Sequence, residues 1–152
     1  MKEERFRLEA LFIDFDPHDW QEAVSVVGKL MMDLGSIEED YIQAMIDVIN
    51  DIGPYIVVIP HLAIAHAAPA TYVLKNDLVV GVFKEPICFG SDNDPVHIII
   101  GLCALSPHSH LEQFQCIADI FSDEDAWLDF CACNTVEELY KLINGSQNER
   151  GD

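Results

Sequence analysis

Basic residues are scarce in this chain of 152 residues. Eight Lys and Arg stand against 27 Asp and Glu, which gives a formal net charge of −19. Nucleic-acid binding depends on Lys and Arg contacts with phosphate, and anionic membranes attract the same side chains. The composition therefore argues against both kinds of partner. It is compatible with a basic protein partner, and solubility alone is the alternative explanation of the charge.

Long apolar runs are also absent, although half of the residues are hydrophobic. No run approaches the roughly 20 apolar residues with which a helix crosses a bilayer. The N-terminal residues Met1 to Arg5 are of mixed charge, and no apolar segment typical of a signal peptide follows them. We therefore expect a cytoplasmic protein without direct membrane insertion.

Several chemical motifs are missing. The chain has no GxGxxG or GxxxxGK[ST] nucleotide fingerprint, and no GxSxG elbow of a serine hydrolase. It has no CxxC, and an odd number of cysteines is typical of reduced thiols in a reducing compartment. We expect no cofactor and no metal. The cysteines are Cys88, Cys103, Cys116, Cys131 and Cys133.

The apolar spacing predicts one α/β domain over residues 1–152, with helices on both sides of a run of strands. Asp19 is the expected N-cap of the first helix, and two capping boxes, Ser36 with Glu39 and Thr135 with Glu138, begin later helices. Strands are expected at 11–15, 55–59, 78–83 and 96–102. Helices are expected at 19–34, 36–52, 110–121, 124–131 and 135–143, before a frayed polar tail at 144–152.

Two histidines follow apolar strands. His66 comes after the run at 55–59, and His110 comes after the run at 96–102. Sites in α/β proteins are built at such sheet edges. If Ser109 caps the next helix, His110 lies in a first turn that favours an anion. The pattern predicts a pocket in which one neutral imidazole attacks phosphorus, while the other imidazole and helix-start N–H groups bind the phosphoryl oxygens.

Other uses of the histidines stay open at this point. Each of them can be an ordinary surface or core residue, and we interpret His18 and His97 in that way. A tetrahedral zinc site is a competing interpretation, but the spacings do not match known zinc motifs. Its ligands would be His61, His66, His108 and His110.

From about Asp19 to Ile143 the chain resembles the enzyme IIA domains, mannitol/fructose type, of the bacterial phosphoenolpyruvate-dependent sugar phosphotransferase system. The ascorbate-type branch is the most similar. Each matching piece is short, and their order and spacing carry the resemblance. The pieces are residues 19–23 (DWQEA), 41–45 (YIQAM), 53–58 (GPYIVV), 62–67 (LAIAHA), 86–90 (PICFG), 93–96 (NDPV) and 110–111 (HL).

The resemblance implies a mixed β-sheet and a phosphotransferase that works through phosphohistidine. It places the phosphorylated histidine on His66 and the supporting histidine on His110. The implied partners are the phosphocarrier protein HPr, an enzyme IIB for carbohydrate uptake, with ascorbate as one candidate, and indirectly a membrane enzyme IIC. A homodimer and a purely regulatory or binding module of the same fold stay open as alternatives.

Two positions depart from the resembled pattern. The family usually has glycine where this chain has His61, and the ascorbate-type branch commonly has arginine where this chain has Ala68. Loss of that positive charge would weaken the stabilisation of a phosphoryl group. His61 is a candidate to compensate for the loss, if it lies near the site.

Overall fold

Five strands form one mixed sheet in the computed structural model, which describes residues 6–16 and 18–145. The order across the sheet is β1-β4-β5-β3-β2. β1 pairs with β4, and β3 with β5, in parallel, whereas the other two pairings are antiparallel. The strands are β1 (Leu11–Asp14), β2 (Val57–Ile59), β3 (His61–Ala65), β4 (Asp77–Ile87) and β5 (Val96–Cys103).

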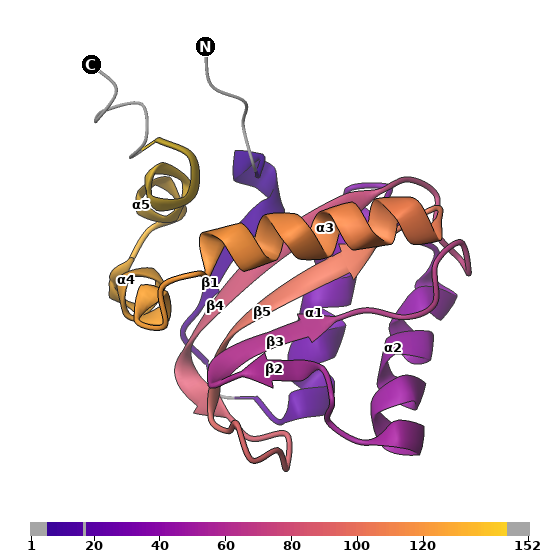
Figure 1. Ribbon diagram of the computed structural model, residues 1–152, viewed down its shortest axis with the longest axis horizontal. Helices are drawn as coiled ribbons and strands as arrows, with labels where there is room; N and C mark the ends of the chain where they lie inside the picture. The colour runs from indigo at the N-terminus through magenta and orange to yellow at the C-terminus, as the bar shows by residue number, and fades with distance from the viewer. Residues whose placement is uncertain (1–5, 17, 146–152) are drawn as a thin grey trace.

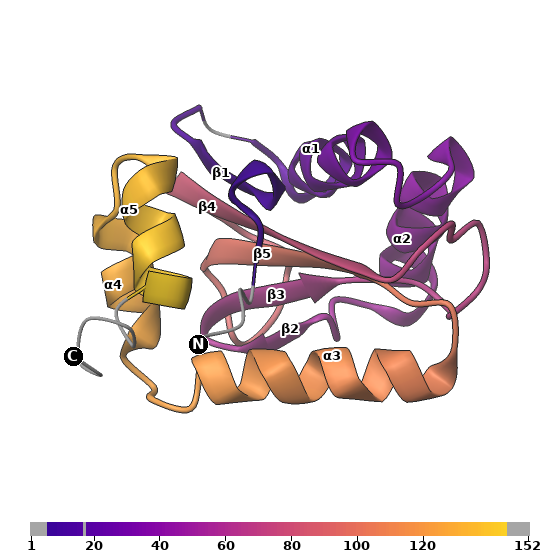
Figure 2. The same ribbon diagram turned by 90° about the horizontal axis from the view of Figure 1, so that it is seen from above.

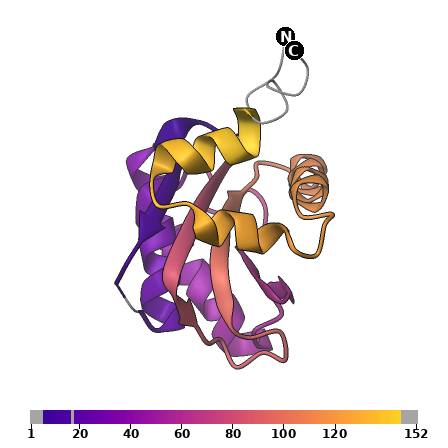
Figure 3. The ribbon, with the colours of Figure 1, turned by 90° about the vertical axis from the view of Figure 1, so that its left-hand side faces the viewer.

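Helices cover both faces of this sheet, as the sequence predicted. α1 and α2 lie on one face, α3 crosses the other, and α4 and α5 pack at one end (Figures 1, 2 and 3). Within the described residues, none of these helices is long and apolar enough to span a membrane. The helices are α1 (Trp20–Asp33), α2 (Glu39–Ile52), α3 (Pro107–Ile120), α4 (Ala126–Ala132) and α5 (Val136–Tyr140), with short turns at Leu8–Ala10 and Lys141–Gly145.

Two hydrophobic clusters sit on the two faces of the central strands. Side chains of a strand point alternately to opposite faces, so Val79 and Phe83 of β4 join the cluster beneath α1 and α2. Val80 and Val82 of the same strand join the cluster that Ile117 of α3 also enters. A sheet covered on both faces explains why β4 and β5 are nearly continuous apolar runs. The expected single α/β domain is confirmed.

The helix starts were predicted in part. Asp19 and Thr135 are N-caps within complete capping boxes, as expected. The expected capping box of Ser36 and Glu39 is wrong, because Glu38 is the N-cap of α2 and its side chain makes no capping bond. Ser36 is buried instead, and its hydroxyl donates to the carboxylate of Asp77.

The segment after Ile59 was the main error of the prediction. Residues 60–65 were interpreted as part of a loop, but a turn at Pro60 leads directly into β3. His61 adopts a positive φ of 76° there, which turns the chain back against β2. Residues 57–59 and 61–65 therefore form the two strands of a tight hairpin, and Tyr55 and Ile56 of the expected strand lie in the turn before it.

The C-terminal boundary also needs correction. Asn144, which was assigned to a frayed tail, is buried and exchanges two hydrogen bonds with the backbone of Phe6, at 3.1 Å and 2.9 Å. These bonds join the two ends of the described chain. Residues 146–152, the rest of the expected tail, lie outside the described residues.

Asp77 at the start of β4 connects three separate segments. Its carboxylate accepts from Arg7 at 2.9 Å and 2.7 Å, from Ser36 in the α1–α2 connection, and from its neighbour Leu78 N at 2.9 Å. The Asp77 side chain is only 10% exposed. Because charged hydrogen bonds of low exposure are stronger than surface pairs, this carboxylate contributes to stability.

We expect Asp77→Asn to lower the free energy of unfolding by about 2–3 kcal/mol, since the half-buried Arg7 guanidinium and the buried Ser36 hydroxyl lose an ionised acceptor. Urea unfolding followed by circular dichroism measures the change. Asp47→Asn is the matched control, because Asp47 is exposed and accepts only from Gln43 on its own helix. Equal stability of the two variants would contradict the role given to Asp77.

Candidate active site

His66 and His110 meet at the edge of the sheet where the parallel strands β3 and β5 end. His66 directly follows β3, and α3 begins shortly after β5, on the same side of the molecule (Figure 1). The two imidazole ring centroids lie 5.4 Å apart, with 57° between the ring planes. The carboxyl ends of parallel strands are the usual position of sites in α/β proteins. The structure thus brings together the two histidines singled out by the sequence.

Tyr41 fixes the backbone beside His66. Its buried hydroxyl accepts a hydrogen bond from Ala67 N at 2.9 Å and donates one to Leu102 O at 2.8 Å. Burial raises the pKa of this phenol well above its usual range, so the hydroxyl stays protonated. One side chain of α2 therefore ties the end of β3 to the end of β5.

The hydrogen bond of His66 defines which nitrogen is reactive. Its Nδ1 lies 2.8 Å from Ile64 O. A carbonyl oxygen only accepts, so Nδ1 carries the proton and donates it, and the lone pair is on Nε2. Burial lowers the pKa of His66, the bond to Ile64 partly offsets that effect, and the nearby His110 lowers the pKa further. A neutral imidazole with a free Nε2 is the nucleophilic form.

An aromatic shell surrounds the pair. The ring of Phe114 from α3 meets His66 edge to face, with centroids 5.4 Å apart, and lies 5.0 Å from the ring of His110. Tyr55 meets His66 on another side, at 5.9 Å. These contacts hold the rings in place and exclude water from one side of them. Sequence reasoning missed Tyr41, Tyr55 and Phe114, since nothing in their spacing shows that they converge.

The start of α3 differs from the expectation. Ser106, not Ser109, is the N-cap, so His110 is the fourth residue of the helix. Ser109 N donates to Ser106 Oγ, His110 N donates to Ser106 O, and Pro107 has no N–H. The expected supply of free helix-start N–H groups is therefore largely consumed within the helix. The imidazole of His110 is the polar group of this helix that faces His66.

His110 itself carries an unpaired atom. Its Nδ1 is buried and has no hydrogen-bond partner among the described residues. Burial also lowers the pKa of His110. A buried polar atom without a partner is uncommon in folded proteins, and here it lies beside the ring of His66. Such an atom is consistent with a site whose hydrogen bonds are completed by a ligand.

The other histidines do not belong to this site. His108 is 81% exposed on the side chain and faces Glu112. His61 stands at the opposite end of β3, roughly 16 Å away along the strand, where it contacts His97 and Trp127. His61 had been expected near the site, and that expectation is wrong. His61 is therefore too distant to compensate for the missing charge at Ala68.

The zinc interpretation fails for the same reason. The strand that separates His61 from His66 prevents a shared ion, and the described residues contain no group of three or more His, Cys, Asp or Glu arranged to hold a metal. His18 pairs with Asp14 at 2.8 Å, in line with the structural role expected for it.

Apolar surface adjoins the histidines. A groove of about 280 Å³ runs between the hairpin of β2 and β3 and the helix α3, and Ile64 and Phe114 line it. Further exposed apolar side chains are Tyr55, whose ring contacts His66, and Leu105 and Leu111, which lie near His110 in sequence. Apolar surface around a reactive group is typical of a protein that docks another protein.

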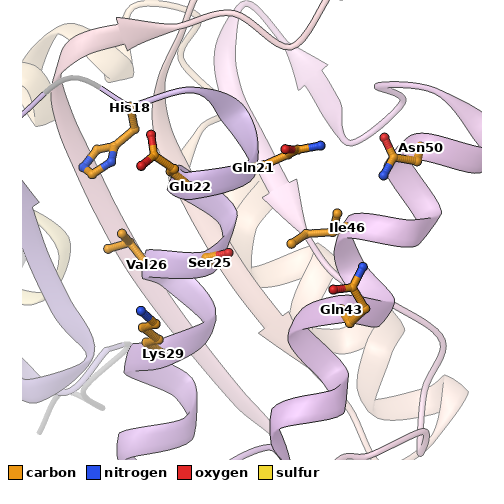
Figure 4. Close-up of a pocket in the computed structure, with 9 residues that line it drawn as sticks. All are labelled: His18, Gln21, Glu22, Ser25, Val26, Lys29, Gln43, Ile46 and Asn50. Carbon is orange, nitrogen blue, oxygen red and sulfur yellow. The ribbon is translucent and has the colours of Figure 1, made fainter.

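A second groove, of about 500 Å³, opens between α1 and α2 (Figure 4). It is lined largely by polar side chains, among them Gln21, Gln43 and Asn50, which Figure 4 shows on the two facing helices. Neither His66 nor His110 lines this groove. The histidine pair and this larger groove are therefore separate features.

Comparison with known proteins agrees with this geometry. Residues 4–146 match the family described as phosphoenolpyruvate-dependent sugar phosphotransferase system, EIIA 2. The ascorbate-specific PTS system EIIA component of Escherichia coli (strain K12) is 35% identical over 127 residues, which is 82% of each chain. The solution structure of the mannitol-specific cryptic phosphotransferase enzyme IIA of Escherichia coli is 26% identical, with a TM-score of 0.82 over 91% of this chain and 94% of that one.

A second similar structure is the enzyme IIA for mannitol from Escherichia coli in complex with phosphorylated enzyme IIB. It has a TM-score of 0.80 at 21% identity, over 91% of this chain and 96% of that one, and so supports the fold. The extent of the family match and the identity to the relative from strain K12 decide the class. The chain belongs to the EIIA type 2 family of the sugar phosphotransferase system, and is a phosphohistidine-carrying phosphotransferase component.

We expect His66 to titrate below the ordinary pKa of 6.5 and to keep its proton on Nδ1 when neutral. Nitrogen-15 correlation spectra of the histidine rings across a pH series measure both properties. In His110→Asn the pKa of His66 should rise, because a repulsive neighbour is removed. A neutral His66 with its proton on Nε2 would contradict the assignment of the nucleophilic atom.

The same pKa gives the sign of a pH effect on stability. Below pH 6.5 the unfolded chain binds a proton at His66 more readily than the folded chain does. His66 therefore makes the free energy of unfolding fall as the pH falls through that window. The contribution disappears in His66→Ala, which serves as its control.

Proposed function

We propose that His66 is the phosphoryl carrier, that His110 supports the phosphoryl group, and that the donor and acceptor are HPr and a cognate enzyme IIB. The observation that carries this proposal is the hydrogen bond from His66 Nδ1 to Ile64 O, since it leaves the Nε2 lone pair free next to His110. The family's phosphohistidine chemistry requires a nucleophilic nitrogen of this kind.

The step at His66 is an in-line displacement. The Nε2 lone pair forms a bond to phosphorus while the bond between phosphorus and the donor's histidine nitrogen breaks, and the electron pair of that bond leaves with the donor's imidazole. Nδ1 keeps its proton throughout, and Ile64 O stabilises the positive charge that develops on the ring. Transfer to the enzyme IIB is the same displacement in the reverse sense, with His66 as the leaving group.

His110 supplies the positive charge that this site needs. Ala68, two residues after His66, is exposed and carries no charge. A phosphoryl dianion on His66 would raise the pKa of a neighbouring imidazole, because an opposite charge favours its protonated form. His110 then takes up a proton when His66 is phosphorylated and donates a hydrogen bond to a phosphoryl oxygen. Its unpaired Nδ1 in the unphosphorylated protein supports this role.

The partners would meet His66 on the apolar surface beside it. Tyr55, Leu105 and Leu111 provide exposed apolar area, and the acidic remainder of the chain attracts a basic face of HPr. We place the protein in the cytoplasm, where it would serve a membrane enzyme IIC through its enzyme IIB. Ascorbate is the carbohydrate that the 35% identical relative supports.

A regulatory module of the same fold is the second candidate. The observation that favours it is Ala68, since a site without a fixed cation holds its phosphoryl group less firmly and is suited to signalling its phosphorylation state. Such a protein would label at His66 without passing phosphate to any enzyme IIB. Transfer to a panel of purified enzymes IIB distinguishes the two candidates.

Labelled phosphoenolpyruvate, with purified enzyme I and HPr, should place acid-labile, base-stable phosphate on the protein. We expect no label in His66→Ala, because the attacking nitrogen is gone. In His110→Ala we expect transfer to slow by about 10²–10³-fold, the typical cost of one stabilising donor.

His108→Ala is the matched control for the labelling experiment, since His108 lies near His110 in sequence but faces solvent. It should label at the wild-type rate. Full labelling of His66→Ala, or no labelling of the wild type alongside a working enzyme IIA, would refute the carrier role of His66.

The charge of −19 should make transfer from HPr sensitive to salt. We expect the second-order rate to fall about tenfold or more between low salt and about 0.5 M salt, since screening shortens the range of attraction to a few ångströms. Rapid quench-flow experiments measure the rate of transfer, and circular dichroism checks that the fold is unchanged. A rate independent of salt would rule out electrostatic steering.

A further inference from the structure

We propose that His61 and His97 form a binding site for a divalent late transition-metal ion, with their two Nδ1 atoms as ligands and water in the other positions. The pair lies at the start of β3 and of β5, at the opposite end of these strands from His66. The proposal does not depend on phosphoryl transfer.

The two nitrogens already converge at the distance that one ion needs. His61 Nδ1 and His97 Nδ1 lie 3.1 Å apart and share a hydrogen bond, so each points toward the other. With metal–nitrogen bonds of about 2.05 Å, this separation corresponds to an angle of about 98° at the metal. That angle lies between those of square-planar and tetrahedral sites. The ion would lie beside the line that joins the two nitrogens, so each ring must turn in its own plane to aim its Nδ1 lone pair at the ion.

The protonation states also fit. Without metal, one Nδ1 carries a proton and the other accepts it. Metal binding needs both lone pairs, so the donor ring would move its proton to Nε2, and both rings would stay neutral.

Trp127 of α4 holds the rings in this arrangement. Its indole stacks on His61, with centroids 3.5 Å apart and 16° between the planes, and lies 5.3 Å from the ring of His97. Nitrogen lone pairs lie in the plane of an imidazole, so stacking on the ring face leaves Nδ1 accessible while it restricts rotation. Figure 3 shows α4 against the end of the sheet, where β3 and β5 begin.

The backbone of His61 is an independent observation. Its φ of 76° lies in the left-handed region that favours glycine. A side chain at such a position costs free energy, and strained residues concentrate at functional sites. Here the strained residue provides one of the two converging nitrogens.

The donor set selects the ion. Neutral imidazoles suit Cu²⁺, Ni²⁺ and Zn²⁺, whereas Mg²⁺ and Ca²⁺ prefer oxygen ligands. The ammonium group of Lys84 donates to Cys131 O, at the other end of α4 from Trp127. It is therefore engaged away from the two Nδ1 atoms.

Tryptophan fluorescence gives a local readout of binding. The chain has two tryptophans, so Trp20→Phe leaves Trp127 as the only reporter. Titration of this full-length variant with Ni²⁺, which the cysteines do not reduce, should quench Trp127 to saturation at one ion per chain. His97→Gln should weaken Ni²⁺ binding at least about tenfold, since loss of an outer-shell partner alone often costs that much.

His61→Gly is the most informative variant, because glycine accepts the positive φ. We expect it to be at least as stable as the parent chain to urea and to lose Ni²⁺ quenching. A loss of binding in this variant therefore cannot come from misfolding. His18→Gln is the matched control, because His18 pairs with Asp14 elsewhere, and it should quench like the parent.

Three results would overturn the proposal. The first is quenching by Ni²⁺ that does not saturate. The second is an unchanged Ni²⁺ affinity in a folded His61→Gly or His97→Gln. The third is loss of the signal in His18→Gln, which would place the ion at His18 and Asp14 instead.

Discussion

The parallel pairing of β3 with β5 is the constraint on which the rest of the molecule depends. Because the two strands run in the same direction, their carboxyl ends lie together, and so do their starts. One edge receives His66 and the helix that carries His110. The other edge receives His61 and His97. Tyr41 secures the first edge by hydrogen bonds to the residues Ala67 and Leu102, one from each side of the pairing.

Desolvation then determines what each histidine can do. Burial favours the neutral imidazole at His66, and in that form the ring is a nucleophile. The same effect makes a charged phosphoryl group costly in this place unless a partner responds to it. His110 can respond because its own pKa lies low in the resting state and because its Nδ1 is unpaired. Under the proposed function, the site would therefore develop its positive charge when the phosphoryl group arrives, instead of holding it permanently.

Much of the fold could be predicted from the sequence, for physical reasons that are specific to each element. Asp19 and Thr135 have a glutamate three residues later and a regular apolar stripe, so local signals were sufficient. Ser36 has the same local signal, but tertiary contact with Asp77 prevails over it. Likewise, β3 was missed because a histidine with positive φ forms the turn, where a sequence pattern would require glycine or asparagine.

Of the residues in the candidate site, only the two histidines could be predicted from the sequence. His66 and His110 follow apolar runs, and an imidazole is a candidate nucleophile, acid or base by its residue type alone. Phe114 reaches His66 because α3 crosses the sheet, and Tyr55 reaches it from the connection between α2 and β2. The sequence spacing predicts neither approach. The same limitation explains the error over His61, since a residue five positions away on a strand is at the far edge, whereas on a loop it would be near.

The hydrogen-bond partner of Nδ1 distinguishes the two pairs of histidines and fits the different function proposed for each. At His66 the partner is a backbone carbonyl, which can only accept, so one tautomer is imposed and Nε2 stays reactive. At His61 the partner is another imidazole, which can donate or accept, so neither tautomer is imposed. A fixed tautomer suits a nucleophile that must repeat one displacement in both directions. An exchangeable proton between two converging lone pairs suits a cation that takes the place of that proton.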